Sequence, residues 1–325
     1  MTLHISEAEV RAVLTMPLAL DAVEEISRKQ AMGEVIVHPR RRFELPGGVF
    51  FHYMATVDTS LGLVAMKQYT YVRGKLQFLV PLYEMATGGL LTLIEGDYLG
   101  QLRTGAASGV ATKYLARENS RVAAIIGTGP HARTQLEAVA TVRKLKSARA
   151  YGRDTARREK FCEEMSKRLG IPVSPCLSAA EAVRGADIVS TATTASTPVV
   201  NGADLAPGAH INAIGSNHAH KRELDDEAVA SADVIVVDSV EQSRQEAGDL
   251  IIAFHGDETC WTGVKKLPEI VIGKASGRTS DTEVTLFKSN GIASWDLAVA
   301  MKIYALAKER GLGRELPLWS NGAKG

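Results

Sequence analysis

The stretch RVAAIIGTGPHARTQL, residues 121–136, decides the fold. Val122–Ile126 is a continuous apolar run, as expected for a β-strand that is covered on both faces. Glycines at 127 and 129 follow, and then a helical stretch. A second short strand is expected at 148–151. Strand, glycine turn, helix and strand in this order predict the first unit of a parallel sheet.

The glycine turn has the pattern GxGxxA, with Gly127, Gly129 and Ala132 around Pro130 and His131. The first glycine permits a tight turn, the second lets the backbone approach a pyrophosphate, and the alanine allows close helix packing. Free N–H groups and the helix dipole then favour phosphate. The pattern predicts a dinucleotide site, whereas a strand-turn-helix that binds nothing is the simpler alternative.

The alternation of strands and helices continues beyond this unit. A helix is expected at 155–169, with strands at 187–191, 210–214 and 234–238. We therefore expect an α/β protein whose residues 117–290 form a Rossmann domain with a doubly wound parallel sheet.

The residues before this domain have a different rhythm. Ser6 and Glu9 have capping-box spacing, and a second helix should begin near Pro17 and stop near Gly33. Short antiparallel strands are expected from 41 to 94, with turns that include Pro46-Gly47-Gly48 and Thr87-Gly88-Gly89, and then a helix over 103–116. We expect an N-terminal α+β domain of residues 1–116, completed by residues 291–325 with a helix at 294–310.

Composition excludes several classes of protein. The chain has 325 residues and a formal net charge of +1, which gives no electrostatic reason to expect nucleic acid or an anionic membrane as partner. Its apolar runs are too short for a membrane span, and the start MTLHISEAEV lacks the features of a signal peptide. Three scattered cysteines suggest reduced thiols, so we expect a cytoplasmic protein.

The end of the second Rossmann strand bears on the choice of cofactor. An NAD enzyme usually presents Asp or Glu there to the ribose hydroxyls, but this chain has Gly152. Arg153, and Arg157 one turn later, could instead bind a 2′-phosphate. The alternative is that Arg153 only begins a solvated helix that Asp154 caps. We expect NADP(H) to be preferred, with NAD(H) possible.

Several segments together resemble the ornithine cyclodeaminase and mu-crystallin family, over residues 5 to 310. They are LRTGAAS at 102–108, GTGPHARTQL at 127–136, PGAHI at 207–211, AIG at 213–215, GRTS at 277–280 and TLFKSNG at 285–291. The resemblance implies a homodimer, with an N-terminal domain that supplies dimer contacts and substrate groups and a Rossmann domain for the nicotinamide cofactor.

The resemblance also assigns substrate-binding residues. Arg41 matches the arginine that binds a substrate carboxylate, with a register uncertain by one because Arg40 and Arg42 adjoin it. A basic strand edge in water is the alternative for these arginines. Lys67 matches the active-site lysine, and a lysine in an apolar strand is costly to bury without a partner. An outward-facing Lys67 is the alternative.

Three further residues bear on the chemistry. Arg103 matches an arginine that meets the cofactor pyrophosphate or the substrate, and a structural salt bridge is its alternative. Asn217 stands where ornithine cyclodeaminases have an aspartate, and an amide has neither the charge nor the basicity of a carboxylate. His52 replaces a glutamate of those enzymes and is either a proton donor or a satisfied core residue.

The remaining expected ligand contacts come from the resemblance alone. Positions that match the nicotinamide surroundings or other cofactor contacts are Thr193, Ile214, Lys221 and Ser289, and Asn290 is expected at the substrate. His218 and His220 lie close in sequence but lack a Cys or acidic cluster, so we expect no metal.

These residues predict a reductase that transfers hydride to an imine carbon next to a carboxylate. A cyclic ketimine, a pyrroline carboxylate, or a 2-oxo acid with an amine could supply the imine, and the product is an amino acid. One alternative is an ornithine or lysine cyclodeaminase that recycles NAD internally, against which Asn217 argues. The other is a crystallin-like protein that binds NADPH or a small molecule without turnover.

Overall fold

The computed structural model describes residues 2–318 and divides them into two compact units. Unit 1 contains the chain up to Arg103 together with the segment from Ile292 onward, and unit 2 is Thr104–Gly291. The division falls inside one helix, α3 (Asp97–Leu115), whereas the sequence predicts it after residue 116. The helix itself begins six residues before the expected start at 103.

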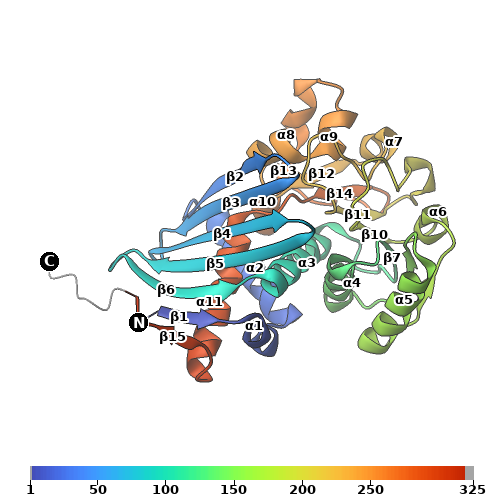
Figure 1. Cartoon of the computed structure of the whole chain (residues 1–325). Helices are drawn as coiled ribbons and strands as arrows, with labels where there is room; N and C mark the ends of the chain where they lie inside the picture. Colours follow the sequence, from blue (N-terminus) through green and yellow to red (C-terminus); the bar gives the residue numbers. More distant parts are fainter. Residues whose placement is uncertain (1, 319–325) are drawn as a thin grey trace. The chain divides into compact units, whose positions relative to one another are not determined.

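Unit 1 contains a seven-stranded sheet in the order β15-β1-β6-β5-β4-β3-β2 (Figure 1). Only the β1–β6 neighbours are parallel. The strands are β1 (Thr2–Ile5), β2 (Val35–Leu45), β3 (Val49–Asp58), β4 (Leu63–Val72), β5 (Lys75–Glu84), β6 (Gly89–Glu95) and β15 (Arg314–Leu316). β2 to β5 are 10 or 11 residues long, so the expectation of short strands is wrong. Both predicted glycine turns close hairpins of this sheet.

Helices cover one face of this sheet. They are α1 (Glu7–Val13), α2 (Met16–Ala31) and α11 (Ala293–Glu309). The predicted capping box of Ser6 and Glu9 is present at α1. α11 packs on α2, β3 and β4, so the C-terminal helix lies against N-terminal elements of the same unit. Its inward residues, such as Trp295 and Leu297, are fully buried.

Unit 2 contains an eight-stranded parallel sheet in the order β13-β12-β14-β11-β10-β7-β8-β9. The strands are β7 (Val122–Ile126), β8 (Ser147–Tyr151), β9 (Val173–Pro175), β10 (Ile188–Thr191), β11 (His210–Ala213), β12 (Val234–Val237), β13 (Lys265–Lys266) and β14 (Thr285–Lys288). β14 lies between β11 and β12 and was not predicted as a strand. The strand order reverses between β7 and β10, the place where such sheets bind ligands at their carboxyl ends.

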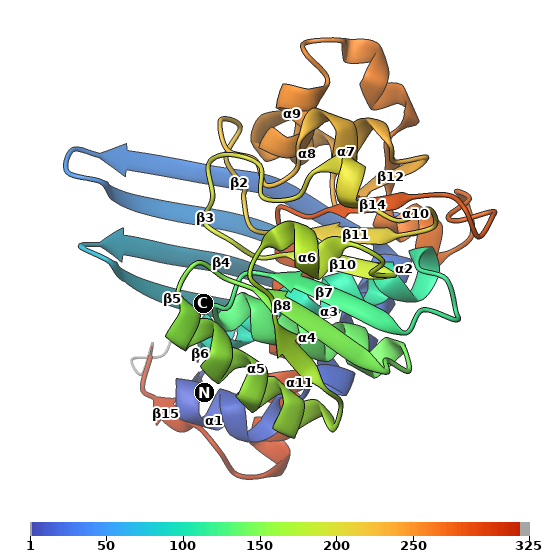
Figure 2. The same cartoon turned by 90° about the vertical axis from the view of Figure 1, so that its right-hand side faces the viewer.

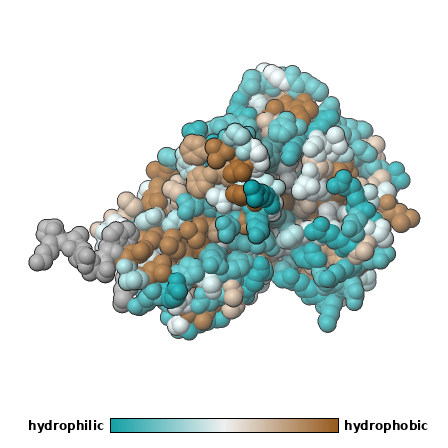
Figure 3. Space-filling view, viewed as in Figure 1, coloured by the Kyte–Doolittle hydropathy of each residue, from teal (hydrophilic) through white to brown (hydrophobic). Residues whose placement is uncertain are grey.

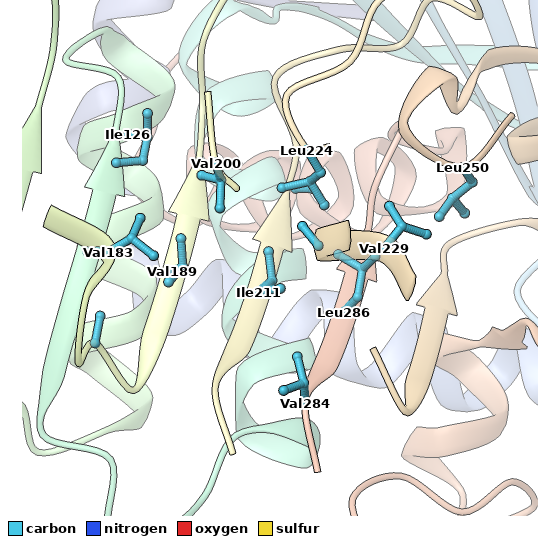
Figure 4. Packing of buried hydrophobic residues seen from close by; sticks show 14 of the residues in the cluster. Ile126, Val183, Val189, Val200, Ile211, Leu224, Val229, Leu250, Val284 and Leu286 are labelled. Atoms are coloured by element: carbon cyan, nitrogen blue, oxygen red, sulfur yellow. The ribbon is translucent and has the colours of Figure 1, made fainter. Parts of the chain in front are cut away.

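Helices pack on both faces of this sheet (Figure 2). The longer ones, besides α3, are α4 (Pro130–Val142) and α5 (Thr155–Leu169), and they bury one face with residues such as Leu136 and Phe161. The other face packs against α6 (Ala179–Val183), α7 (Asp226–Ala230) and α9 (Gly248–Ala253), and α8 (Val240–Glu246) and α10 (Leu267–Val271) complete the set. Figure 4 shows this second core, where Val189, Ile211 and Leu286 of neighbouring strands meet the helices.

The architecture confirms the predicted class, an α/β protein with a doubly wound parallel sheet and a separate antiparallel N-terminal part. Among residues 2–318, the helices are too short or too polar for a membrane crossing.

Candidate active site

The glycine turn of unit 2 connects β7 to α4. Gly127 has φ +116°, and a Cβ at this position would lie 2.4 Å from the Ala192 carbonyl oxygen, so only glycine fits. Gly129 is the N-cap of α4, and a Cβ there would meet nothing within 4 Å. Pro130 and His131 are exposed in the first turn. The turn therefore presents its backbone at the start of a 13-residue helix, as a pyrophosphate site needs.

Small residues bring α4 close to its neighbours. Ala132 is fully buried against the sheet. A Cβ on Gly105 of α3 would lie 2.5 Å from the Thr134 carbonyl oxygen, and Gln135 Nε2 donates to the Thr104 carbonyl oxygen at 3.1 Å. The glycine of the LRTGAAS segment therefore serves helix packing behind the turn.

The end of β8 is shaped by Gly152. A Cβ at this position would lie 2.8 Å from Thr128 Cγ2, so an acidic side chain there would displace Thr128. Arg153 and Arg157 follow and are exposed. Asp154 caps α5 by accepting from the Arg157 N–H at 2.9 Å, so the cap named in the alternative interpretation is present, beside the exposed arginines.

A buried glutamate organises the loops after β10 and β11. Glu223 accepts hydrogen bonds from Thr191 Oγ1 at 2.6 Å, from the N–H and hydroxyl of Thr193 at 2.7 and 2.8 Å, and from the Gly215 N–H at 2.7 Å. The Thr193 hydroxyl, expected at the nicotinamide, is thus bound by Glu223. The half-buried Ile214 lies between β11 and this Gly215 anchor.

A buried ion pair holds the next part of the same loop. Lys288 Nζ lies 2.8 Å from Asp249 Oδ2 and donates to the Ser216 carbonyl oxygen at 2.6 Å. Burial opposes the charge of Asp249, but Lys288 overcomes it and lowers the pKa of this carboxyl. The pair therefore fixes the loop that carries Asn217 and Lys221, both half-buried.

The loop after β14 is bound by Asp238. Its Oδ2 accepts from Ser289 Oγ at 3.2 Å and from the N–H groups of Asn290 and Gly291 at 2.8 and 2.7 Å. Asn290 Nδ2 donates to Ser243 Oγ at 3.0 Å. Ser289 and Asn290, expected at the cofactor and substrate, therefore bind side chains of unit 2 that the sequence analysis did not identify.

In unit 1, the pairing of β2 with β3 determines which of the adjacent arginines lies on the face of Lys67. A register shift between His38 and Arg41 changes the face on which the arginines lie. Arg41 pairs with Tyr53 and is exposed, whereas Arg40 is 6% exposed and its Nη2 lies 3.9 Å from Met54 Sδ. Because Met54 pairs with Lys67, Arg40 rather than Arg41 lies on the Lys67 face.

Lys67 and Arg103 share one carboxylate. Lys67 Nζ and Arg103 Nε each lie 3.1 Å from Oδ1 of Asp296, in the first turn of α11, and all three side chains are buried. A Cβ on Gly100 of α3 would lie 2.7 Å from Lys67 Nζ, so glycine makes room for the ammonium group. Lys67 is thus inward-facing, as predicted, and Arg103 forms the salt bridge that was its alternative.

Lys67, Arg103 and Asp296 form a buried cluster, the Lys67 cluster, that has more positive than negative charge. Burial and then the Arg103 guanidinium lower the pKa of Lys67 to about 8, although Asp296 acts in the opposite direction. Arg40 adds to this lowering. Arg103 Nη1 and Asp296 Oδ2 are buried and have no hydrogen-bond partner among residues 2–318. The cluster therefore has one donor, Arg103 Nη1, and one acceptor, Asp296 Oδ2, without a partner in the described residues. A ligand with both an anionic oxygen and an N–H group would pair with them.

His52 lies on the same face of β3 as Met54 and is 3% exposed. Its Nδ1 is 2.7 Å from the Tyr69 hydroxyl, with which it shares a hydrogen bond, and its ring stacks on Phe50 at 4.4 Å. The ring is therefore held in place by its neighbours.

His218 and His220 have ring centroids 5.6 Å apart, and residues 2–318 contain no group of three or more His, Cys, Asp or Glu suited to a metal.

The sequence analysis missed Asp296 and Glu223. Asp296 had a usable signal, since it interrupts the apolar run of ASWDLAVA at 293–300 and a carboxylate in such a helix requires a partner. Glu223 had none, because it stands in the polar stretch KRELDDE at 221–227.

Known proteins resemble this chain in sequence and in fold. The chain is 41% identical over 239 residues to a Delta(1)-pyrroline-2-carboxylate reductase of Bacillus cereus, which covers 73% of each chain. A solved structure of Thermococcus litoralis Delta(1)-pyrroline-2-carboxylate reductase in complex with NADH and L-proline superposes with a TM-score of 0.93 at 37% identity, covering 97% of this chain and 100% of the other.

An archaeal alanine dehydrogenase, solved as a dimer with bound NAD, gives a TM-score of 0.91 at 33% identity, covering 98% of this chain and 99% of the other. The family model described as "Ornithine cyclodeaminase/mu-crystallin family" matches residues 2–311. The resemblance noted in the sequence is thereby confirmed, and the chain belongs to the ornithine cyclodeaminase/mu-crystallin family.

Proposed function

We propose that this protein is an NAD(P)H-dependent reductase of imines that adjoin a carboxylate, with an amino acid as product. The observation that carries the proposal is a pair of buried polar atoms, Arg103 Nη1 and Asp296 Oδ2, that have no hydrogen-bond partner among residues 2–318. The first suits a substrate carboxylate oxygen and the second an iminium N–H. The reductase and dehydrogenase relatives support the same class of reaction.

In this mechanism, the residues of unit 1 bind and polarise the substrate. Arg103, Lys67 and Arg40 bind the carboxylate, and Asp296 holds the first two in place. A reduced nicotinamide cofactor, when bound, would supply a hydride for the imine carbon. The C=N electron pair then stays on nitrogen as the lone pair of the amine, which takes a proton from water. Asp296 favours the protonated imine, the better hydride acceptor, because its charge stabilises the cation.

The test is a panel of imines with the purified full chain and either reduced cofactor. The expected result is cofactor oxidation with at least one of pyrroline carboxylate, piperideine carboxylate, or a 2-oxo acid with an amine. Tight cofactor binding with no oxidation by any of them would overturn the proposal and favour a binding protein. Ammonia release from ornithine or lysine without net cofactor turnover would favour a cyclodeaminase.

The proposed cofactor preference is NADPH over NADH. Thr128 opposes an acidic side chain at 152, and Arg153 and Arg157 are exposed beside it for a 2′-phosphate. Fluorescence titration should show tighter binding of NADPH, and Arg153→Ser should reduce the NADPH-to-NADH affinity ratio about tenfold. Lys160→Ser, which removes an exposed charge of the adjoining helix α5, is the control. Equal affinities in the wild type would contradict this preference.

The proposed assembly is a homodimer in the cytoplasm. The sheet face opposite Lys67 carries the stacked rings of Phe43, Phe51 and Tyr53, and Ile36, Phe43 and Leu45 are more than half exposed. Figure 3 shows hydrophobic side chains over the strands of this sheet. Such an exposed apolar face suits a second copy, and the solved alanine dehydrogenase is a dimer. Light scattering should give twice the chain mass, and a monomer would contradict the assembly.

A further inference from the structure

A continuous row of rings extends along the sheet face that carries Lys67. The aromatic row, as we call it, comprises Phe50 and His52 of β3, Tyr69 and Tyr71 of β4, and Phe78 of β5. The strand register sets them side by side, because Phe50 pairs with Tyr71, His52 with Tyr69, and Tyr69 with Phe78. Five rings on adjacent strands form one aromatic surface.

The aromatic row begins at the buried cluster. Lys67 Nζ lies 5.2 Å from the centroid of Phe78, and Phe78 lies 5.0 Å from Tyr69. Tyr69 is 4.8 Å from His52, and Phe50 is 4.4 Å from His52 and 4.8 Å from Tyr71. A ligand whose carboxylate is bound at Lys67 would therefore have rings next to the rest of its atoms.

Packing of the sheet does not explain the aromatic row. Toward the other end of the same strands, the positions on this face are Met54 and Thr56 in β3 and Val80 and Leu82 in β5, all buried. The rings of the row are only half-buried, apart from His52. Aromatic side chains that remain partly exposed beside a buried cation cluster are typical of a ligand-binding surface.

The spacing along β4 gives the size of the ligand. Residues two apart in a strand are separated by roughly 6.8 Å, so Tyr69 lies about that far from Lys67 along the chain. A small 2-oxo acid or a five-membered ring bound at the cluster would end near Phe78. A group with the length of a benzyl substituent would reach Tyr69 and His52.

We propose that the natural substrate is a 2-imino acid that carries an aryl or similarly bulky apolar side chain. This inference rests on the proposed function, since it names the substrate class of the same site. The carboxylate binds at Lys67 and Arg103, and the apolar group packs against Phe78 and Tyr69. His52 Nδ1 and the Tyr69 hydroxyl share a hydrogen bond, which pairs these two polar atoms with each other and leaves the ring faces for apolar contact.

The test compares two imines that differ by one phenyl group. Phenylpyruvate and pyruvate each react with methylamine to give an N-methylimine next to a carboxylate, and only the first product carries a phenyl group. With the full chain and NADPH, we expect kcat/KM to be at least about tenfold higher for the phenyl compound, because differential binding of an apolar group sets the ratio. Phe78→Leu should reduce that ratio about tenfold through loss of ring contact.

A matched variant controls for general effects of losing a ring. Phe254→Leu removes a half-buried phenylalanine that packs on Trp261 in unit 2, and it should leave the ratio within about twofold of the wild type. Thermal unfolding and NADPH binding of both variants verify that they are folded.

The outcomes separate the two proposals. Turnover of both imines without preference for the phenyl compound would overturn the inference and leave the proposed function intact. A preference that Phe78→Leu does not change would also overturn it, because the row would not be its source. Absence of turnover with every imine of the wider panel would overturn the proposed function, and this inference with it.

Discussion

Each unit buries a lysine beside an aspartate, but the two clusters differ in their charge balance. In unit 2, Lys288 has Asp249 and the Ser216 carbonyl as partners, and Asp249 also accepts from the N–H groups of Glu223 and Leu224. In unit 1, Lys67 Nζ and Arg103 Nε both contact the same oxygen, Asp296 Oδ1. Arg103 Nη1 has no hydrogen-bond partner among residues 2–318.

We attribute a structural role to the Lys288 cluster and propose a functional role for the Lys67 cluster, because of this difference. A buried charge is tolerated when an opposite charge and hydrogen bonds compensate it. The Lys288 cluster meets this condition within the chain, so it holds a loop. In the Lys67 cluster the buried positive charges are only partly compensated, and a carboxylate ligand would supply the missing negative charge. Variants of the two lysines should therefore affect different properties.

The largest effect is expected from Lys67→Met. It removes the ammonium group from the proposed substrate site, so kcat/KM for the imine should fall about 10²- to 10⁴-fold. Stability should change by about 1 kcal/mol or less, since Asp296 keeps Arg103 as its partner. Steady-state kinetics and urea unfolding measure the two quantities. Lys75→Met, an exposed lysine of the same sheet, is the control. A stable variant with nearly full activity would refute the role of Lys67.

Lys288→Met should show the opposite pattern. It leaves the Asp249 carboxylate buried without its cation, which costs about 3–5 kcal/mol of the free energy of unfolding. Urea unfolding followed by circular dichroism measures this loss. If Lys288→Met were as stable as the wild type, the balance of charges would not distinguish the two clusters.

The contrast also indicates what a sequence can predict. The glycine turn at Gly127 to Ala132 was predictable because its pattern is local, with the turn, the helix start and the small residue within six positions. The Lys67–Asp296 pair joins residues 229 positions apart, and no local pattern encodes that distance. Lys67 could be flagged as a buried charge, but its partner depends on how α11 packs against β4.

The choice between Arg40 and Arg41 was unpredictable for a related reason. Three adjacent arginines give no apolar alternation from which to read the face of the strand. The β-bulge that turns Arg40 inward arises from the pairing of two strands. β14 was not predicted because its four residues, Thr285–Lys288, include a lysine, and its burial becomes acceptable only with Asp249 and the Ser216 carbonyl as partners.

Variants of Arg40 and Arg41 test whether the buried arginine near Lys67 or the exposed one binds the substrate. Arg40→Ala should raise KM for the imine acid and reduce kcat/KM about tenfold or more, since a buried guanidinium near Lys67 is lost. Arg41→Ala, on the exposed face, should change kcat/KM less than about threefold. Kinetics of both variants with one imine decide the point. A larger effect of Arg41→Ala would restore the original assignment.

The smallest expected effect concerns pH. Below a pKa of about 8, Lys67 is charged and binds the carboxylate, so kcat/KM should fall as the pH rises through that value. Asp296 favours the charged form of Lys67, and Asp296→Asn should therefore move this alkaline limb to lower pH. The stability of the wild type relative to Lys67→Met should rise between pH 8 and 10.5, because the unfolded chain holds the Lys67 proton longer than the folded one. Rate profiles and urea unfolding across this range measure both trends. An alkaline limb that stays in place in Asp296→Asn would mean that another group titrates, and the carboxylate would then serve only to hold α11 against the sheet.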